Sequence, residues 1–398
     1  MVTVSLDLHK TVEPDGPIPA EFFVVGEAPA REELKQGRGF VGPSGRLLWP
    51  LMRRLASLDR MQCRVSNLCH HALDNDVSGD AKLSPEEFEA CSVALYEELI
   101  EVKPRRILAV GALVSRALLG DRFLSMEACN GVGFEIGDFG NGRCFVVPTW
   151  HPAAALRPGG EDKLAHTGAA VAALRDPPIH PMYPPAVPDI SGDLPFDGLI
   201  GIDTEGTPAD PICATVATVD RRCYLDRDEV LAWWNAIQGR DVTLVYHNAP
   251  WDWTCLQAMG IHAPWTVPYV DTMERAYLKQ LPTQGLKPLA WRYLGLRMRS
   301  WEDVVMPHYN EYVRSEADSI IFLGTTTQER SPKTGRLYKK PKHTYTDEAK
   351  ALRRLRDPKK LAERMSLPPP SLRFVPEDEA REYSTLDPWA TVKLWPCI

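Results

Sequence analysis

Three short apolar runs give the first 175 residues a regular pattern. They cover residues 22–25, 107–110 and 145–147, and segments with helical spacing of apolar positions lie between them. Short apolar runs bounded by polar turns are typical of buried strands. Strands that alternate with helices indicate a parallel sheet covered by helices. The pattern therefore predicts an α/β fold for this half of the chain.

Polar residues follow the apolar runs. Glu27 comes just after the first run, Asn67 closes the segment RVSN, and His151 follows the last run. In a parallel α/β sheet, functional groups collect at the carboxyl ends of the strands. The residues alone leave two alternatives open: a site at one sheet edge, or a small α/β domain with ordinary turn residues.

In the second half, apolar runs lead into three short acidic motifs. The motifs are Asp203-Thr204-Glu205, Asn248-x-x-x-Asp252 and Tyr383-x-x-x-Asp387. The segment LIGIDTEGT predicts a buried strand. Because side chains alternate along a strand, its two acids are expected to share one face.

The other two motifs suit helices. Asn248 follows the apolar run 244–246 and is expected to cap a helix that carries Asp252 near its start. Tyr383 and Asp387 are four residues apart, which stacks them on one face of a helix. Four converging carboxylates can hold two divalent cations that activate a water in phosphodiester hydrolysis. The pattern indicates a nuclease, with solvated surface acids as the alternative.

The region from about 197 to 398 resembles the 3′–5′ exonucleases of the RNase H-like superfamily, in the branch with a tyrosine in the third motif. The stretch DTMERAYLKQLPTQGLKPLAWRYLG looks like part of the proofreading domains of family A DNA polymerases. The resemblance implies a mixed-sheet, RNase H-like domain that trims DNA 3′ ends with two Mg²⁺ or Mn²⁺ ions. Tyr383 would orient the attacking water, and the implied metal ligands are Asp203, Glu205, Asp252 and Asp387.

Pro388 departs from a simple helix through the third motif. Proline inside a helix removes a hydrogen bond and clashes with the preceding turn. Either the helix is kinked there, or a new helix begins at Pro388 with Asp387 as its cap. The second arrangement would loosen the stacking of Tyr383 on Asp387.

The first 175 residues resemble the uracil-DNA glycosylase superfamily, most of all its family 4 branch. The matching segments are GEAPA, GFVGPSGRLL, the asparagine of VSN, and HPAAALRP, in that order. The resemblance implies that Phe40 stacks on a flipped-out uracil and Asn67 binds its polar edge. His151 would hydrogen-bond the uracil oxygen, and Glu27 would position or activate the attacking water. Such chemistry needs a grip on the extruded base and a donor for the departing anion.

Cysteine usage departs from family 4, whose members usually hold an iron–sulfur cluster on four cysteines. Residues 1–62 contain no cysteine, so the Cys-x-x-Cys pair near the N-terminus is missing, although Cys91 aligns with one ligand. Because such a cluster needs about four thiolates, we expect no iron–sulfur cluster.

These patterns predict an α/β chain of two domains, with a proline-rich connector between them. The predicted boundaries are 1–176 for the glycosylase-like domain, 177–196 for the linker and 197–398 for the exonuclease domain. A basic insertion is expected at about 326–370, because residues 330–364 carry 13 bases against 4 acids. Charge interleaved with aromatic residues suits a single strand, whereas a solvated insertion is the alternative. The expected DNA-binding residues are Lys339, Lys340, Lys342, Arg353 and Arg354.

Composition agrees with a DNA-processing enzyme that works inside the cell. No apolar run reaches membrane length, so no membrane partner is expected. Nine cysteines without Cys-x-x-Cys spacing favour reduced thiols in a cytoplasm. The architecture, an exonuclease of polymerase type without its polymerase, would fit a bacterial or phage-infected cytoplasm. The net charge of −7 is unfavourable for binding DNA phosphates. The basic segment is therefore expected to provide most of the phosphate contacts.

Three functional interpretations stay open on sequence grounds. The preferred one is a dual enzyme that excises uracil from DNA and trims 3′ ends, with single strands or 3′ ends as substrate and a separate DNA polymerase as a partner. The alternative is an exonuclease whose N-terminal half is a non-catalytic DNA-binding or polymerase-docking module. A weaker third is an RNA exonuclease, because the acidic motifs do not discriminate between sugars.

Overall fold

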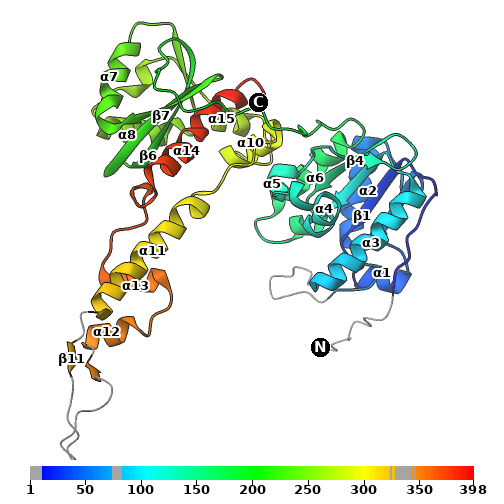
Figure 1. Ribbon diagram of the computed structural model, residues 1–398. Coiled ribbons are helices and arrows are strands. Elements are labelled where there is room, and N and C mark those ends of the chain that lie inside the picture. The colour runs from blue at the N-terminus through cyan, green and yellow to red at the C-terminus, as the bar shows by residue number, and fades with distance from the viewer. Residues whose placement is uncertain (1–10, 74–82, 323–324, 328–341, 345) are drawn as a thin grey trace, which may run out of the picture. The chain divides into compact units, whose positions relative to one another are not determined.

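The computed structural model describes residues 11–73, 83–322, 325–327, 342–344 and 346–398. The chain forms two compact units (Figure 1). The first consists of Met1–Ala186 and Arg275–Arg297, and the second of Val187–Glu274 and Met298–Ile398. A segment from the second half of the sequence therefore belongs to the first unit.

The first unit is built on a five-stranded sheet with the order β2-β1-β3-β5-β4. Strands β2, β1, β3 and β5 run parallel to one another, and β4 pairs antiparallel with β5. The strands are β1 (Phe22–Gly26), β2 (Cys63–Asn67), β3 (Arg106–Val110), β4 (Phe134–Asp138) and β5 (Arg143–Thr149). This confirms the α/β fold expected from the apolar runs, and adds an antiparallel edge strand that the pattern did not predict.

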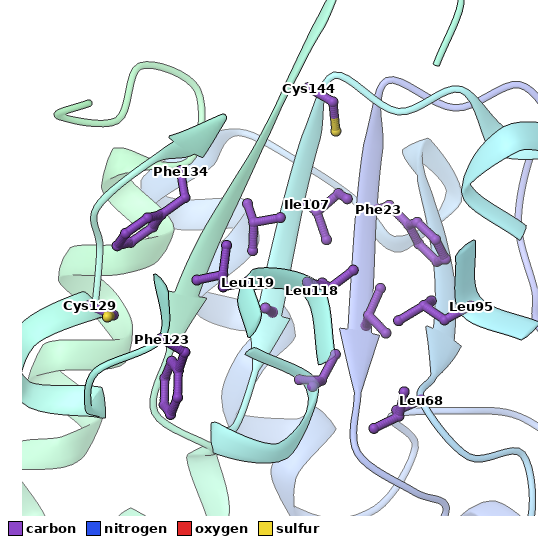
Figure 2. Packing of buried hydrophobic residues seen from close by; sticks show 14 of the residues in the cluster. Phe23, Leu68, Leu95, Ile107, Leu118, Leu119, Phe123, Cys129, Phe134 and Cys144 are labelled. Carbon is purple, nitrogen blue, oxygen red and sulfur yellow. The ribbon is translucent and has the colours of Figure 1, made fainter. Parts of the chain in front are cut away.

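Helices cover both faces of this sheet, because both faces of each inner strand are apolar. Phe22 and Val24 pack with helices α2 (Pro43–Ala56) and α6 (Glu161–Ala173). Phe23 and Val25 point to the other face, toward α3 (Pro85–Val102) and α4 (Ala112–Leu119), where Figure 2 shows the packed side chains. Buried strands in a parallel sheet have this two-sided apolar character. The shorter helices are α1 (Arg31–Gln36) and α5 (Met126–Cys129).

Helix α10 (Leu286–Leu294) packs against the first unit through Trp291, which is only 9% exposed and belongs to the same apolar cluster as Phe23. The Trp291 ring lies 4.7 Å from the His180 ring, which in turn stacks 4.5 Å from Phe134. His180 lies within the proline-rich 177–196 segment. Its backbone N–H donates to Gly133 O at 2.9 Å, so the beginning of this segment packs on the sheet of the first unit.

The second unit contains a mixed five-stranded sheet with the order β10-β9-β6-β7-β8. Strands β6, β7 and β8 are antiparallel, whereas β9 runs parallel to β6 and β10 runs parallel to β9. The strands are β6 (Gly198–Thr207), β7 (Asp210–Thr218), β8 (Arg221–Asp226), β9 (Val242–Tyr246) and β10 (Tyr269–Asp271).

The two faces of β6 pack against different helices. Ile200 and Ile202 pack with α7 (Arg227–Ile237) and α8 (Ala249–Ala258). Gly201 faces α15 (Leu386–Leu394), where a β-carbon would lie 2.1 Å from Pro388 O. Glycine therefore permits a backbone approach that any side chain would block. By strand alternation, Asp203 and Glu205 lie on this α15 face.

Helix α11 (Trp301–Phe322) leads away from this sheet, and α12 (Asp347–Leu352) and α13 (Pro358–Met365) pack along it (Figure 1). Tyr309, Val313 and Leu361 belong to the apolar cluster that joins these helices. The remaining elements are α9 (Thr272–Leu278), α14 (Glu377–Ser384) and the short strands β11 (Thr325–Thr327) and β12 (Lys342–Thr344). Within the described ranges, no helix is long and apolar enough to cross a bilayer.

The buried imidazole of His180 predicts a pH-dependent stability of the first unit. Burial, followed by the charge of Arg122, lowers the pKa of His180 from 6.5 to about 4. Above pH 6.5 the ring is neutral in both the folded and the unfolded chain. Between pH 6.5 and 4 mainly the unfolded chain takes up the proton, so the free energy of unfolding of the first unit should fall as the pH is lowered, by at most about 1.4 kcal/mol per pH unit.

The measurement is chemical denaturation of the full chain at pH 7.5 and pH 5, for the wild type and for His180→Phe. The phenyl ring retains the stack between Phe134 and Trp291 but cannot titrate, so the variant should lose less stability on acidification. An equal loss in both proteins would show that His180 does not carry this dependence.

Candidate functional sites

Phe40 and Asn67 meet at the end of β1, above Gly26. A β-carbon on Gly26 would lie 2.4 Å from Asn67 Oδ1 and 2.8 Å from Phe40 Cζ. The parallel pairing of β1 and β2 places Gly26 directly beside Asn67. The missing side chain at Gly26 therefore lets the ring and the amide approach the same point. An aromatic ring and a bidentate amide are the two groups that can grip a planar base by its face and its edge.

The backbone of Phe40 is held in the left-handed region, with φ 52°. Its carbonyl oxygen accepts a hydrogen bond from Trp49 Nε1 at 3.1 Å. A non-glycine residue with positive φ is strained by about 1 kcal/mol or more and persists only where its surroundings hold it. Here that conformation turns the Phe40 ring onto the strand end.

Glu27 is fixed by backbone donors from neighbouring segments. Its Oε1 accepts from Leu113 N at 2.8 Å, and its carbonyl accepts from Cys69 N at 3.0 Å. Gly111 has φ 114°, and a β-carbon there would lie 2.4 Å from Glu27 Oε1. The carboxylate therefore sits in a cradle at the ends of β1 and β3 that only glycine leaves open.

His151 follows β5 and caps the short 3₁₀ turn Pro152–Leu156. Its Nδ1 accepts from Ala153 N at 3.3 Å. Burial, and then the charge of Arg157, lower the pKa of His151 to about 4. The ring is therefore neutral near pH 7, and because Nδ1 is the acceptor, Nε2 carries the proton. His151 thus presents one N–H donor without a net charge.

Glu33 was not singled out from the sequence, yet it is 6% exposed and lies near His151. Its Oε1 accepts from Gly42 N at 2.7 Å, and its charge acts on the His151 ring in the direction of a higher pKa. The sequence gives little indication that Glu33 is buried, because its neighbours include both acidic and basic residues, as is typical of an exposed helical turn. Its burial became visible only with the fold.

Cys69 lies beside Cys91, with 2.7 Å between the two sulfur atoms. Over the described ranges, no group of three or more His, Cys, Asp or Glu side chains could hold a metal ion. Two cysteines do not match a cluster that requires about four thiolates. The donor set therefore does not fit an iron–sulfur cluster, and its expected absence stays a prediction.

Comparison with known proteins connects this first unit to a family. Residues 13–175 match the uracil DNA glycosylase superfamily. The type-4 uracil-DNA glycosylase of Pyrobaculum aerophilum is 32% identical over 164 residues, which are 38% of this chain and 77% of the relative. That of Archaeoglobus fulgidus is 31% identical over 159 residues, 38% of this chain and 76% of the relative. By this similarity the chain belongs to the uracil DNA glycosylase superfamily.

Coverage of the relatives is not uniform. The type-4 uracil-DNA glycosylase of Sulfurisphaera tokodaii is 32% identical over 142 residues, and the chain spans 61% of its length. The family match ends at residue 175 and leaves out the second unit. Family membership therefore bears on the N-terminal unit alone.

In the second unit, three further carboxylates lie near Asp203, which stands in the middle of β6. Burial and the negative charges of Asp252, Asp387 and Glu205 raise the pKa of Asp203 well above its usual value. Like charges held this close favour protonation of one of them. Such a group is electrostatically unfavourable without a bound cation or proton.

Thr204 orients Asp252 from the opposite face of β6. Asp252 Oδ1 accepts from Thr204 N at 3.0 Å and from Thr204 Oγ1 at 2.7 Å. Asp252 is 2% exposed, and burial raises its pKa to about 7 in spite of these two bonds. The oxygen-rich donor set suits Mg²⁺ or Mn²⁺. Asp252 is turned toward Thr204, however, and the acids are not drawn together at metal-ligand distances.

Asn248 occupies the predicted N-cap position of α8, but its side chain makes no cap bond and its φ is 80°. Asp271 provides the cap instead, accepting from Asn248 N at 3.2 Å and Ala249 N at 2.7 Å. The same carboxylate accepts from Met273 N at 2.7 Å at the start of α9. One buried acid therefore caps two helices. The sequence showed Asp271 only as part of the exonuclease-like stretch.

The third motif spans two helices. Helix α14 ends at Ser384 and α15 begins at Leu386, with Thr385 in helical conformation between them. The helix is thus interrupted at Thr385, before Pro388, which lies in the first turn of α15, and Asp387 is not the cap. Burial, then the charges of Asp387 and Glu205, raise the pKa of Tyr383. Tyr383 therefore stays close to the acids despite the break.

The predicted DNA-binding residues of the basic insertion are only partly visible. Lys339 and Lys340 lie outside the described residues, and Lys342 is described by its backbone in β12 alone. Arg353 and Arg354 are exposed after α12. Part of the local charge is paired, since Lys350 contacts Asp347 at 2.9 Å and Arg364 contacts Glu348 at 2.8 Å.

Gly201→Ala should destabilise the second unit, because its β-carbon would meet Pro388 O at 2.1 Å and push α15 from β6. Overpacking of this kind costs about 1–3 kcal/mol, which is about 2–4 °C in Tm per kcal/mol for a unit of this size. The matched control is Gly192→Ala, where nothing lies within 4 Å of the added carbon. Scanning calorimetry measures both; an unchanged Tm for Gly201→Ala would refute the close approach.

Proposed function

We propose that the first unit excises uracil from DNA by hydrolysis of the glycosidic bond. The observation that carries the proposal is the geometry of His151: its Nδ1 accepts from Ala153 N–H, so in the neutral ring that burial favours the proton is on Nε2, which can donate it. It stands at the same sheet edge as Phe40, Asn67 and Glu27. By the resemblance, Phe40 and Asn67 would bind the flipped base, and Glu27 would activate the attacking water. Family membership supports this choice of chemistry.

The reaction follows from these groups. A uracil flipped from the strand would stack on Phe40 and bond through its edge to Asn67. As the bond from the sugar carbon to the base nitrogen breaks, the electron pair moves onto uracil and its oxygen becomes negative. The Nε2–H of His151 stabilises that oxygen without first losing a proton. Water positioned by Glu27 attacks the sugar carbon, and its proton passes to the carboxylate.

The test is release of free uracil by the full chain in EDTA, from uracil opposite guanine, opposite adenine and in single strands. His151→Ala should lower the rate about 10²- to 10³-fold, as for the loss of one donor to a developing anion. Because the pKa of His151 is lowered to about 4, the rate should show no titration near pH 6.5. Glu27→Gln should slow the attack of water, and Phe40→Ala should weaken capture of the base.

The matched control is His262→Ala, an exposed histidine of the second unit, which should release uracil at the wild-type rate. Absence of release from all three substrates by folded protein would favour the alternative, a DNA-binding or polymerase-docking module.

The acids of the second unit favour a second activity, which is metal-dependent 3′–5′ exonuclease hydrolysis of DNA in an RNase H-like domain. The observation in its favour is that Asp252, Asp387 and Glu205 lie near enough to Asp203 for their charges to raise its pKa. The mixed sheet and the proximity of Tyr383 to the same acids agree with the resemblance. These four acids would hold two Mg²⁺ or Mn²⁺ ions, which supply a nucleophilic water and stabilise the leaving oxygen. Tyr383 would orient that water.

Replacing Asp203 and Glu205 together with Ala should abolish Mg²⁺- or Mn²⁺-dependent loss of nucleotides from labelled 3′ ends. Uracil release in EDTA should be unchanged, because no step of it uses these acids. The control pair is Asp197→Ala with Asp241→Ala, exposed acids at the opposite ends of β6 and β9. Normal end-trimming by the Asp203/Glu205 variant would place the nuclease elsewhere.

The proposal extends to setting and partners. A chain with these two activities would act on single strands or 3′ ends of DNA in a cytoplasm, bacterial or phage-infected. A separate DNA polymerase is the natural partner of a proofreading-type exonuclease. Among the predicted DNA-binding residues, Arg353 and Arg354 are the two whose side chains the structure describes; both are exposed and would follow the strand.

A further inference from the structure

Helix α10 belongs to the first unit although it comes from the second half of the sequence. It lies in the sequence between β10 and α11 of the second unit, yet it packs on α5 in the first. Trp291 contributes the apolar part of the contact, as described above. The polar part comes from its neighbour Arg292, whose Nη1 donates to Asn130 O at 2.6 Å.

Asn130 connects this arginine to the loop that carries His151. The residue is fully buried. Its Oδ1 accepts from Trp150 N at 3.2 Å, and its Nδ2 donates to His166 O at 3.0 Å. Both ends of the amide are therefore committed, which leaves one orientation of the side chain.

Trp150 immediately precedes His151, and both of its backbone polar groups are bound. Its N–H goes to Asn130, and its carbonyl accepts from Thr167 Oγ1 at 3.1 Å. A peptide held at both groups has little freedom to rotate. The entry of the chain into the His151 turn is thus set by Asn130 and Thr167, and Asn130 is itself held by Arg292.

We propose that Arg292 is a positioning residue for the glycosylase site, acting through Asn130 on the turn that presents His151. The inference rests on the proposed uracil excision and extends it to a residue outside the family match, which ends at residue 175. The positively charged guanidinium bound to the Asn130 carbonyl fixes that residue by a charge-assisted hydrogen bond. A misplaced donor weakens stabilisation of the departing anion more than it weakens binding of the base.

The experiment uses the full chain in EDTA, with Arg292→Ala, Arg292→Lys and the control Arg297→Ala. Arg297 is exposed and lies just beyond the same helix. Arg292→Ala should lower kcat for uracil release about 10-fold with little change in KM. Arg292→Lys should recover part of the loss, because it keeps a cationic donor, and Arg297→Ala should match the wild type.

A second readout separates positioning from loss of fold. The nitrogen NMR signals of His151 report its tautomer and surroundings, and they should change in Arg292→Ala while Tm stays within a few degrees of the control. Equal kcat in Arg292→Ala and Arg297→Ala would overturn the inference. So would a fall in kcat that accompanies a rise in KM and a large loss of Tm, with the His151 signals of the remaining folded protein unchanged.

The same readout distinguishes this inference from the proposed function. If the wild type releases no uracil, the proposed activity is wrong. The NMR signals of His151 then test by themselves whether Arg292 positions the His151 turn. A changed His151 signal in Arg292→Ala, absent in Arg297→Ala, would then still support the link. Identical signals in the two variants would refute it.

Discussion

Close approach of side chains and helices to the backbone of a strand is the constraint on which both candidate sites depend. At the end of β1, Gly26 lets the Phe40 ring and the Asn67 amide reach one point. In β6, Gly201 lets the backbone of α15 contact the strand and so carries Asp387 toward Asp203. In each case a β-carbon would collide with the functional element itself. The sites are therefore formed by main-chain packing, and the functional side chains follow from it.

The sequence was most informative where a buried strand ends in a polar residue. Strands 22–25, 107–110 and 145–147 became neighbours in one parallel sheet, because apolar runs of this kind can only be buried between helices. Residues such as Glu27, Asn67 and His151 then fall at one edge by geometry. Capping was less predictable. Asn248 holds the predicted position, but the carboxylate that caps the helix is Asp271, 23 residues further on.

Long-range contacts could not be anticipated from local pattern. Helix α10 has the composition of an amphipathic helix that could pack on any apolar surface, and its resemblance to proofreading domains favoured the second unit. The unpredicted partner is the surface made by Phe134, His180 and α5. His180 lies in a proline-rich segment that local composition marks as an extended connector. Its burial results from the tertiary contacts of its ring with Phe134 and Trp291.

Burial shifts the pKa values at the two sites in opposite directions, which would make the two proposed activities separable. In the first, burial depresses the pKa of His151 and keeps a donor neutral, so charge appears only when the base departs. In the second, burial and three neighbouring carboxylates raise the pKa of Asp203, because like charges held close together repel one another. Under the two proposed functions, a chelator would remove the ions required at the second site and would leave the first site unaffected. Chelation and replacement of Asp203 and Glu205 should therefore affect the same activity. Replacement of Arg292, Asn130 or His151 should affect the other.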